Sequence, residues 1–185
     1  MKLILLRHEK REDYPGFYSN LTKDGFKDSF KLINKLDKFN INYIYCSPLV
    51  RTLQTIHPYC IKNNKKVFVE YALHEYKHNP YFLIEPKIYD IQDINNNFLT
   101  KISDKKYKTK FKKTDFNYIL LEDENHLEKR LKKFLDKLKK NQKMKNETIL
   151  LVTHKGVINK IKKMHNLCND MDNEFEKGHF EVINI

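Results

Sequence analysis

The chain has 185 residues, of which 40% are hydrophobic and 12% aromatic, so it can bury the core of one globular domain. It contains no run of the roughly 20 apolar residues that a membrane-spanning helix needs, so we expect no membrane partner. The formal net charge of +12, carried almost wholly by lysine, favours anionic partners such as phosphorylated substrates or nucleic acid, although a solvated lysine-rich surface gives the same charge.

The first half of the chain predicts two strands and two helices. The apolar run "KLILL" at Lys2–Leu6 fits a strand that is buried on both faces, and Ile41–Ser47 fits a second strand. Between them, Thr22 can cap the N-terminus of a helix. The side chains expected near the buried face of this helix are Phe26, Phe30, Ile33 and Leu36 or Asp37. A second helix follows the second strand, with Ser47 as its N-cap and Pro48 as its first residue.

The second half continues the alternation of strands and helices. The expected strands are residues 66–73, 147–154 and 179–185, and the expected helices are residues 123–140 and 155–167. Residues 76–121 are polar, rich in Lys, Asn and aromatics, and lack a clear pattern, so we expect a variable insertion or cap there. The alternation predicts a three-layer α/β sandwich, with helices on both faces of a mostly parallel central sheet, in a single domain over residues 1–185.

Charged and imidazole side chains follow three of the predicted strands. Arg7 and His8 come after the first strand, Arg51 lies one turn into the helix after the second, and His154 ends the segment 147–154. Because ligands bind at the carboxyl ends of strands in open α/β sheets, we expect these side chains to lie close together. A single histidine is more often structural than catalytic, but three such clusters from distant parts of the chain indicate a functional site.

Five segments, taken in chain order, resemble motifs of the histidine phosphatase superfamily, the phosphoglycerate mutase-like proteins. "LILLRHEK" is similar to the family's strand ending in Arg-His-Gly, and "LTKDGFKDS" to its L-T-x-x-G stretch. "YCSPLVRTLQT" is similar to its S-P-L-x-R-x-x-Q-T motif, and "ILLVTHKGVI" to its strand ending in V-T-H-G-G. "DENHLEKRLKKFL" resembles its Glu-Ser…Arg helix. The resemblance covers Met1–Glu75 and Glu122–Ile185 and implies the phosphoglycerate mutase-like fold.

This resemblance implies a phosphatase that hydrolyses a phosphomonoester without a metal or cofactor. His8 would be the nucleophile that becomes phosphohistidine, and Arg7 and Arg51 would bind the phosphate. His154 would bind and stabilise the phosphoryl group from the opposite side, and Glu75, after the third strand, would be the general acid and base. The residue types suit this chemistry, because the planar guanidinium group matches phosphate geometry and fixed cations stabilise a transferring phosphoryl group.

The chain departs from the family motifs at several positions. Glu9 stands where the family usually has glycine and could place a negative charge near the phosphate. Lys10, Arg11 and Lys155 are candidate substrate contacts that could offset this charge, or they are ordinary solvated side chains. The Ser/Thr and Asn that follow Arg-His-Gly in mutases are missing from "EKREDYPG", which favours a phosphatase over a mutase-type phosphoryl transferase.

The expected substrate is a phosphorylated small molecule or a phosphoprotein. An alternative from another class is a pseudoenzyme that binds nucleic acid or a phosphoprotein through its basic surface. A binding module does not need two histidines and an acid, so nucleic-acid binding is not favoured. The oligomeric state has no signature in the sequence.

Two other motifs compete with this interpretation. "HEYKH", from His74 to His78, fits the H-E-x-x-H zinc motif, but that motif needs a helix, which Asn79 and Pro80 would stop. Glu75 lies within this stretch. Other carboxylates that could replace Glu75 as the acid are Glu70, Glu85 and Asp90.

Cys46 precedes Arg51 in "CSPLVR", which suggests the loop of cysteine phosphatases. That loop needs five residues between the cysteine and the arginine, and this chain has four, so we expect Cys46 to be a buried strand residue. Together with Cys60 and Cys168 it forms an odd set without C-x-x-C spacing, which predicts reduced thiols and a cytoplasmic location.

Overall fold

The computed structural model describes residues 1–13, 16, 18–77, 101–107, 109, 121–171 and 173–185. The central sheet in this part of the chain has five strands in the order β3-β2-β4-β1-β5. The strands are β1 (Lys2–Arg7), β2 (Tyr43–Cys46), β3 (Phe68–Val69), β4 (Thr148–Thr153) and β5 (Phe180–Asn184). The first four pair in parallel, and β5 joins β1 in antiparallel orientation at the edge. The prediction of a mostly parallel sheet is confirmed.

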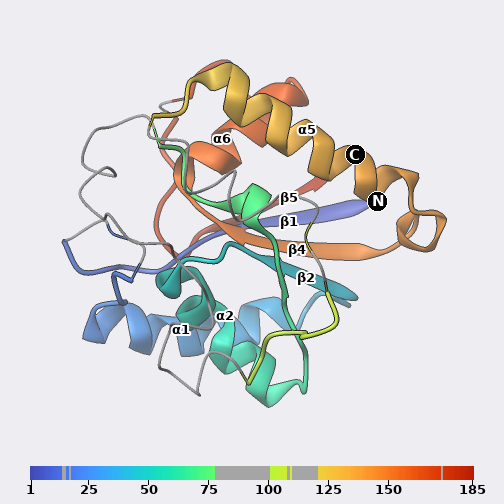
Figure 1. The fold of residues 1–185 in the computed structure, drawn as a ribbon. Helices are drawn as coiled ribbons and strands as arrows, with labels where there is room; N and C mark the ends of the chain where they lie inside the picture. Colours follow the sequence, from blue (N-terminus) through green and yellow to red (C-terminus); the bar gives the residue numbers. More distant parts are fainter. Residues whose placement is uncertain (14–15, 17, 78–100, 108, 110–120, 172) are drawn as a thin grey trace.

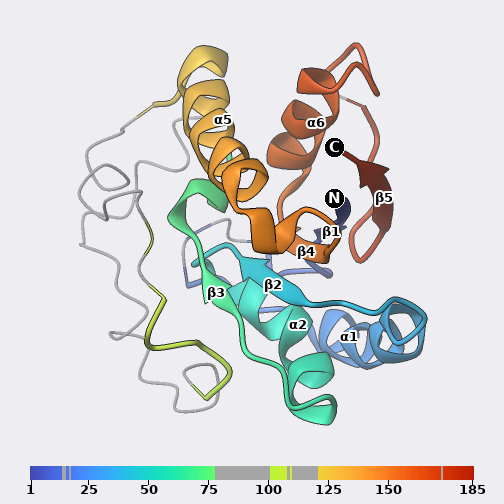
Figure 2. The same ribbon diagram turned by 90° about the vertical axis from the view of Figure 1, so that its right-hand side faces the viewer.

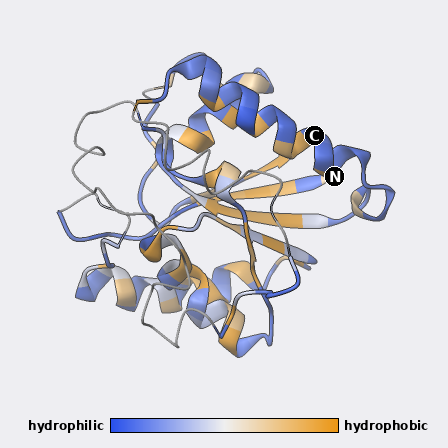
Figure 3. Ribbon diagram, viewed as in Figure 1, coloured by the Kyte–Doolittle hydropathy of each residue, from blue (hydrophilic) through white to orange (hydrophobic). Residues whose placement is uncertain are grey.

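Helices cover both faces of this sheet (Figures 1 and 2). The helices are α1 (Lys23–Leu36), α2 (Val50–Lys62), α5 (Glu124–Lys140) and α6 (Lys155–Met164), with short 3-10 helices η1 (Tyr71–Leu73) and η4 (Gln142–Met144). The α1 and α2 helices lie on one face, and α5 and α6 lie on the other. Hydrophobic residues concentrate in the strands and on the inner sides of the helices (Figure 3). The predicted α/β fold is confirmed.

The first strand contributes side chains to both hydrophobic cores. Ile4 and Leu6 pack in the core beneath α1 and α2, whereas Leu3 and Leu5 pack in the core beneath α5 and α6. All four are fully buried, and burial of each such side chain stabilises the fold by roughly 1.5–3 kcal/mol. The prediction of a strand buried on both faces is correct. Because β1 lies between β4 and β5, the residues that follow β1 lie inside the edge formed by the carboxyl ends of the parallel strands.

Helix α1 begins as predicted, and its buried face matches the prediction at Leu36, which is fully buried, and at Ile33, which packs against the core, but not at Phe30. Thr22 caps it by accepting a 3.0 Å hydrogen bond from the Gly25 N–H. Phe30, predicted to face the core, is 51% exposed. The buried residues of the helix are Gly25, Ser29, Leu32 and Leu36. A Cβ on Gly25 would lie 2.1 Å from the Lys10 carbonyl oxygen, so glycine allows α1 to pack against the segment after β1 and sets its rotation.

Helix α2 begins at Val50, later than predicted, and its N-cap is Leu49. The Ser47 N–H instead continues the sheet by donating to the Val152 carbonyl at 2.9 Å. The hydroxyl of Ser47 lies 2.9 Å from Nε2 of His154. The prediction of Ser47 as N-cap and Pro48 as the first helical residue is therefore wrong, because the serine side chain is engaged by the histidine.

The strand predicted over residues 66–73 is also shorter in the structure. Only Phe68–Val69 pairs as β3, and the chain then turns into η1. The Glu70 carboxylate caps this turn by accepting a 3.0 Å hydrogen bond from the Ala72 N–H. This early turn brings Glu75, which follows η1, towards the end of β4.

Part of the predicted insertion at 76–121 lies within the described residues. Ile102 is buried, and its carbonyl accepts a 2.8 Å hydrogen bond from the Val67 N–H beside β3. The hydroxyls of Tyr107 and Thr109 donate to the buried carboxylate of Glu70. This piece of the insertion therefore packs against the edge of the sheet. No helix in the described part of the chain is long and apolar enough to cross a membrane.

Candidate active site

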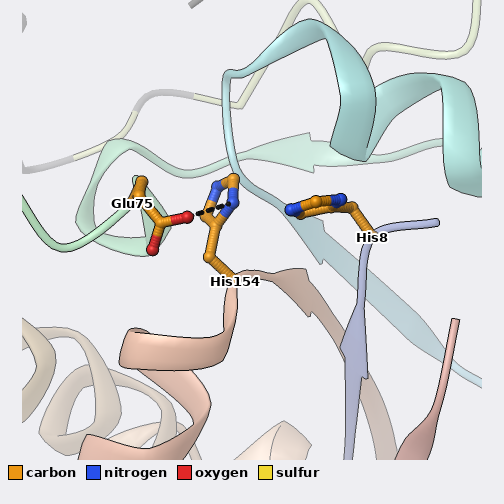
Figure 4. Close-up of side chains that lie close together, drawn as sticks. All are labelled: His8, Glu75 and His154. Atoms are coloured by element: carbon orange, nitrogen blue, oxygen red, sulfur yellow. Dashed lines mark ion pairs between the residues drawn. The ribbon is translucent and has the colours of Figure 1, made fainter. Parts of the chain in front are cut away.

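Five of the predicted site residues lie beyond the carboxyl ends of the parallel strands. Arg7 ends β1 and His8 follows it, Arg51 lies in the first turn of α2, His154 follows β4, and Glu75 follows η1. Figure 4 shows His154 between His8 and Glu75. The ring centroids of the two histidines are 5.2 Å apart. The fold therefore brings together residues that are far apart in the sequence, as predicted for this edge of the sheet.

His8 is buried, and one of its ring nitrogens is fixed. Its Nδ1 lies 2.7 Å from the Glu9 carbonyl oxygen, which can only accept a hydrogen bond, so Nδ1 carries the proton. Burial lowers the pKa of His8 well below its usual value, and the positive charge of Arg51 lowers it further. His8 is therefore a neutral imidazole near pH 7, with the lone pair on Nε2.

His154 is fully buried between two hydrogen-bonding groups. Its Nδ1 lies 3.3 Å from the Glu75 carboxylate, and its Nε2 lies 2.9 Å from the Ser47 hydroxyl. These partners fit a neutral ring in which Nδ1–H points to the carboxylate and Nε2 accepts from the serine. Burial lowers the pKa of His154 to about 4, against the attraction of the Glu75 carboxylate. The role of Ser47 was not predicted.

We expect His154 to make the protein less stable in acid. The unfolded chain binds a proton on this residue near pH 6.5, whereas the folded chain binds it only near pH 4. Stability therefore falls as the pH drops through this window, by about 3 kcal/mol for a pKa difference of this size. Urea unfolding at pH 7 and pH 4.5 should show a smaller acid-induced loss in His154→Gln than in the wild type. Equal losses in both proteins would contradict this burial of a neutral ring.

Arg51 places a buried positive charge at the centre of the cluster. It is 1% exposed, and its Nη1 donates to the Gly16 carbonyl at 2.8 Å and to the Ser19 hydroxyl at 3.2 Å. Its Nη2 lies 3.5 Å from Nδ1 of His154 and 3.7 Å from the Glu75 carboxylate. Anchored on one side by uncharged oxygens, the guanidinium presents its other side to the space shared by the histidines.

Arg7 is the second cation of the site and is half-buried. Its Nη1 donates to the carbonyl of Phe175, and its Nε has no hydrogen-bond partner among the described residues. The Gly178 N–H donates to the Arg7 and His8 carbonyls at 3.2 Å. The segment before β5 therefore wraps around the end of β1. The sequence offered no signal for this contact, because the segment has no regular pattern.

Glu75 is the carboxylate of the cluster. One oxygen accepts a 3.1 Å hydrogen bond from the Tyr76 N–H, and the other faces His154 and Arg51. Burial raises the pKa of Glu75, but His154 and Arg51 outweigh this effect and hold the pKa well below its usual value. Glu75 is therefore ionised in the ligand-free site.

The donor atoms of His8, Glu75 and His154 lie within 4.8 Å of one another, and this is the group in the described part of the chain that could hold a metal ion. The Arg51 guanidinium lies 3.7 Å from the same carboxylate. Its fixed positive charge opposes a divalent cation and favours an anion at this position. The feature of this site that favours an anion is therefore Arg51, and not the three donor residues themselves.

Neither competing motif forms its expected site. His74–Lys77 is not helical, and Nδ1 of His74 bonds the Glu75 carbonyl at 2.7 Å. His78 lies outside the described residues. Cys46 is a fully buried strand residue, as predicted, and burial raises the pKa of its thiol, which opposes a thiolate role.

The remaining candidate residues lie outside this cluster. The Glu9 side chain lies against Gly178, where a Cβ would come within 2.0 Å of its carboxylate. Glu9 is buried and lines a pocket of about 380 Å³ between α1 and the segment before β5, whose charged lining is Lys10, Lys31, Lys35, Lys177, Asp28 and Glu176. Arg11 donates to the carbonyls of two neighbouring residues, and Lys155 is the half-buried first residue of α6. Their roles as substrate contacts remain predictions.

The chain is an α/β protein whose histidine and arginine side chains gather at the carboxyl edge of a mostly parallel sheet. The family model of the histidine phosphatase superfamily (branch 1) matches residues 4–168, and the chain belongs to this superfamily. No match was found among curated proteins.

Solved structures share the fold at low sequence identity. The ecdysone phosphate phosphatase from Bombix mori, in complex with tungstate, is 16% identical with a TM-score of 0.70, over 100% of this chain and 89% of that chain. The alpha-ribazole phosphatase from Shigella flexneri is 18% identical with a TM-score of 0.64, over 100% and 91%. A mycobacterial glucosyl-3-phosphoglycerate phosphatase is 16% identical with a TM-score of 0.69, over 99% and 92%.

Proposed function

We propose that this protein is a phosphatase that hydrolyses a phosphomonoester through a phosphohistidine intermediate on His8. The observation that supports this most strongly is the state of His8, which is neutral, with Nδ1 held by the Glu9 carbonyl and Nε2 left as the nucleophile. Arg7, Arg51 and His154 surround the position that a phosphoryl group would take. Membership of the histidine phosphatase superfamily supports the same reaction.

In the first step, Nε2 of His8 bonds to phosphorus while the ester P–O bond breaks. Arg7 and Arg51 stabilise the charge on the equatorial oxygens. The Nδ1–H of His154 faces Glu75 in the ligand-free site, and it donates to the phosphoryl group from the opposite side once Glu75 carries the proton. Glu75 delivers a proton to the leaving oxygen. This carboxylate is ionised in the ligand-free site, so it becomes protonated when the substrate binds. Either the substrate binds as a phosphate monoanion and brings the proton with it, or a bound phosphate dianion raises the pKa of the Glu75 carboxyl.

In the second step, the Glu75 carboxylate takes a proton from a water molecule as the water oxygen attacks phosphorus. The N–P bond breaks, and the lone pair returns to Nε2 of His8. Inorganic phosphate leaves, and Glu75 is again protonated. It gives this proton to the next leaving group or to the solvent. Transfer to water rather than to a second hydroxyl fits the absence of the mutase residues after His8.

The substrate is a phosphorylated small molecule or a phosphoprotein, with Lys10, Arg11 and Lys155 as candidate contacts beyond the phosphate. We place the protein in the cytoplasm, in agreement with the unpaired state of Cys46 and Cys60. A pseudoenzyme that binds nucleic acid through its lysine-rich surface would instead show salt-dependent binding and no turnover.

We expect hydrolysis of a simple aryl phosphate that does not depend on a metal ion. The cations that stabilise the phosphoryl group belong to the protein, so prolonged treatment with a chelator should leave the rate within about twofold. The test compares phosphate release by chelator-treated protein with and without added zinc. Activity that the chelator abolishes and zinc restores would contradict the proposal and assign the His8, Glu75 and His154 cluster to a metal.

A further inference from the structure

A buried ion pair outside the candidate active site connects helix α5 to the chain around Glu75. Arg130 on α5 is 4% exposed, and Glu122, just before this helix, is 3% exposed. The guanidinium holds the carboxylate with two hydrogen bonds, from Nε at 2.6 Å and from Nη2 at 2.8 Å. None of the proposed chemical steps uses either residue.

The other donors of Arg130 go to the backbone of one short segment. Nη1 donates to the Ala72 carbonyl, and Nη2 lies 3.1 Å from the His74 carbonyl and 3.5 Å from the Glu75 carbonyl. One side chain therefore contacts three carbonyl oxygens within four residues. A lysine could not do this, because its ammonium group lacks the planar fork.

The backbone of Glu122 and the end of β4 hold the same segment from other sides. The Glu122 N–H donates to the Lys77 carbonyl at 2.8 Å. The Thr153 hydroxyl donates to the Leu73 carbonyl at 2.7 Å. Residues 74–77 belong to no helix or strand, so these contacts, rather than a hydrogen-bonded ladder, fix the position of Glu75.

We infer that the Glu122–Arg130 ion pair is a positioning device that holds the general acid and base, Glu75, against His154 and Arg51. This inference rests on the proposed function. Neither member of the pair touches the substrate; both act through the backbone of residues 72–77. A displacement of about 1 Å at a reacting group can cost on the order of 10²-fold in rate, so loosening this segment should impair proton transfer while the phosphate site stays intact.

The expected signature is a selective loss on substrates with poor leaving groups. In Arg130→Lys and in Glu122→Gln, kcat/KM for an alkyl phosphate should fall about 10- to 100-fold. The kcat/KM for an activated aryl phosphate, which reports the formation of phosphohistidine and not its hydrolysis, should change only a few-fold. In a Glu75→Gln background, Arg130→Lys should cause no further loss on the alkyl phosphate, because the group that it positions is already absent.

Lys160→Met is the matched control. Lys160 on α6 is also buried, and its ammonium group pairs with two carboxylates of α5, Glu128 at 2.7 Å and Glu124 at 3.7 Å. Lys160→Met should lower the melting temperature without changing the ratio of alkyl to aryl hydrolysis. Glu122→Gln, which keeps the size of the side chain, decides the question if Arg130→Lys does not fold.

A second measurement needs no turnover. The ¹⁵N signal of Nδ1 in His154 reports its 3.3 Å contact with Glu75, so Arg130→Lys and Glu122→Gln should shift it in the same direction as Glu75→Gln, and Lys160→Met should not. An inactive wild type would reject the proposed function, and this signal would still decide the positioning role. Folded variants with an unchanged alkyl-to-aryl ratio and an unchanged signal would overturn the inference.

Discussion

His8→Ala should abolish phosphatase activity towards both aryl and alkyl phosphates. The substitution removes the nucleophile itself rather than one contact among several, so we expect a loss of roughly 10⁴-fold or more in kcat. The fold should survive, because the side chain of His8 bonds only its neighbour Glu9 among the described residues, and the backbone bonds of residue 8 to Thr153 and Gly178 remain in the alanine variant. Steady-state phosphate release, with circular dichroism as a check of folding, measures the effect.

The control for this substitution is His165→Ala at the end of α6, a partly exposed histidine whose ring contacts the Ile161 carbonyl and Lys139 rather than the cluster. It should keep wild-type activity within a few-fold. If His8→Ala retained a tenth of the wild-type rate, the nucleophile would be another group. Cys46→Ser would then be the next variant to measure, although its buried thiol makes that outcome hard to reconcile with the structure.

Glu75→Gln should slow alkyl phosphate hydrolysis by about 10²–10⁴-fold, the usual contribution of a general acid or base. An alkoxide is a poor leaving group and needs the proton, whereas an activated aryl oxide leaves without it. The value of kcat/KM, which reports the first step and not the hydrolysis of phosphohistidine, should therefore fall much less for the aryl ester. The glutamine side chain can still accept the hydrogen bond from the Tyr76 N–H. The ratio of the two rates isolates proton transfer from any general damage.

Glu70→Gln provides the control for this second prediction. Glu70 is buried, and its carboxylate accepts hydrogen bonds from the Ala72 N–H, Tyr107 and Thr109, so we expect it to serve the fold rather than the reaction. Its substitution should leave the ratio of alkyl to aryl hydrolysis unchanged. Normal alkyl phosphatase activity in Glu75→Gln would move the acid role to Glu70, Glu85 or Asp90, of which the last two lie outside the described residues.

The fold class was predictable because the hydrophobic patterns were unambiguous. The runs at β1 and β4 are apolar at every central position, and only a strand with a helix layer on each side can bury such a run. The cap at Thr22 was equally clear, and the structure confirms it, since Thr22 accepts a hydrogen bond from the Gly25 N–H. The histidines and arginines then had to meet, because parallel strands end at one edge.

The errors in secondary structure arose where tertiary contacts outweighed local preference. Ser47 is a strong N-cap residue, but its hydroxyl is held by His154, so the helix starts later. Phe30 fits an apolar periodicity, but the close approach of Gly25 to Lys10 turns the phenyl ring towards solvent. Neither partner is adjacent in sequence, so no local pattern could reveal these contacts.

The residues of the candidate site were easier to predict than the contacts that hold those residues in place. The family motifs named Arg7, His8, Arg51 and His154, but not the carbonyl of Phe175 that orients Arg7. The concern that Glu9 would repel the phosphate depended on a side-chain direction that the sequence does not encode. In the structure, the Glu9 carboxylate lies against Gly178, in the pocket between α1 and the segment before β5.

The most direct test of the phosphohistidine mechanism is to find where the phosphate goes. Wild-type protein is mixed with an aryl phosphate, quenched in alkali within milliseconds, and digested for mass spectrometry under conditions that preserve phosphohistidine. We expect acid-labile phosphate on the peptide that contains His8, formed at least as fast as turnover and absent from His8→Ala. Phosphate on Cys46 or on a serine, or turnover with no covalent phosphate at all, would contradict the mechanism.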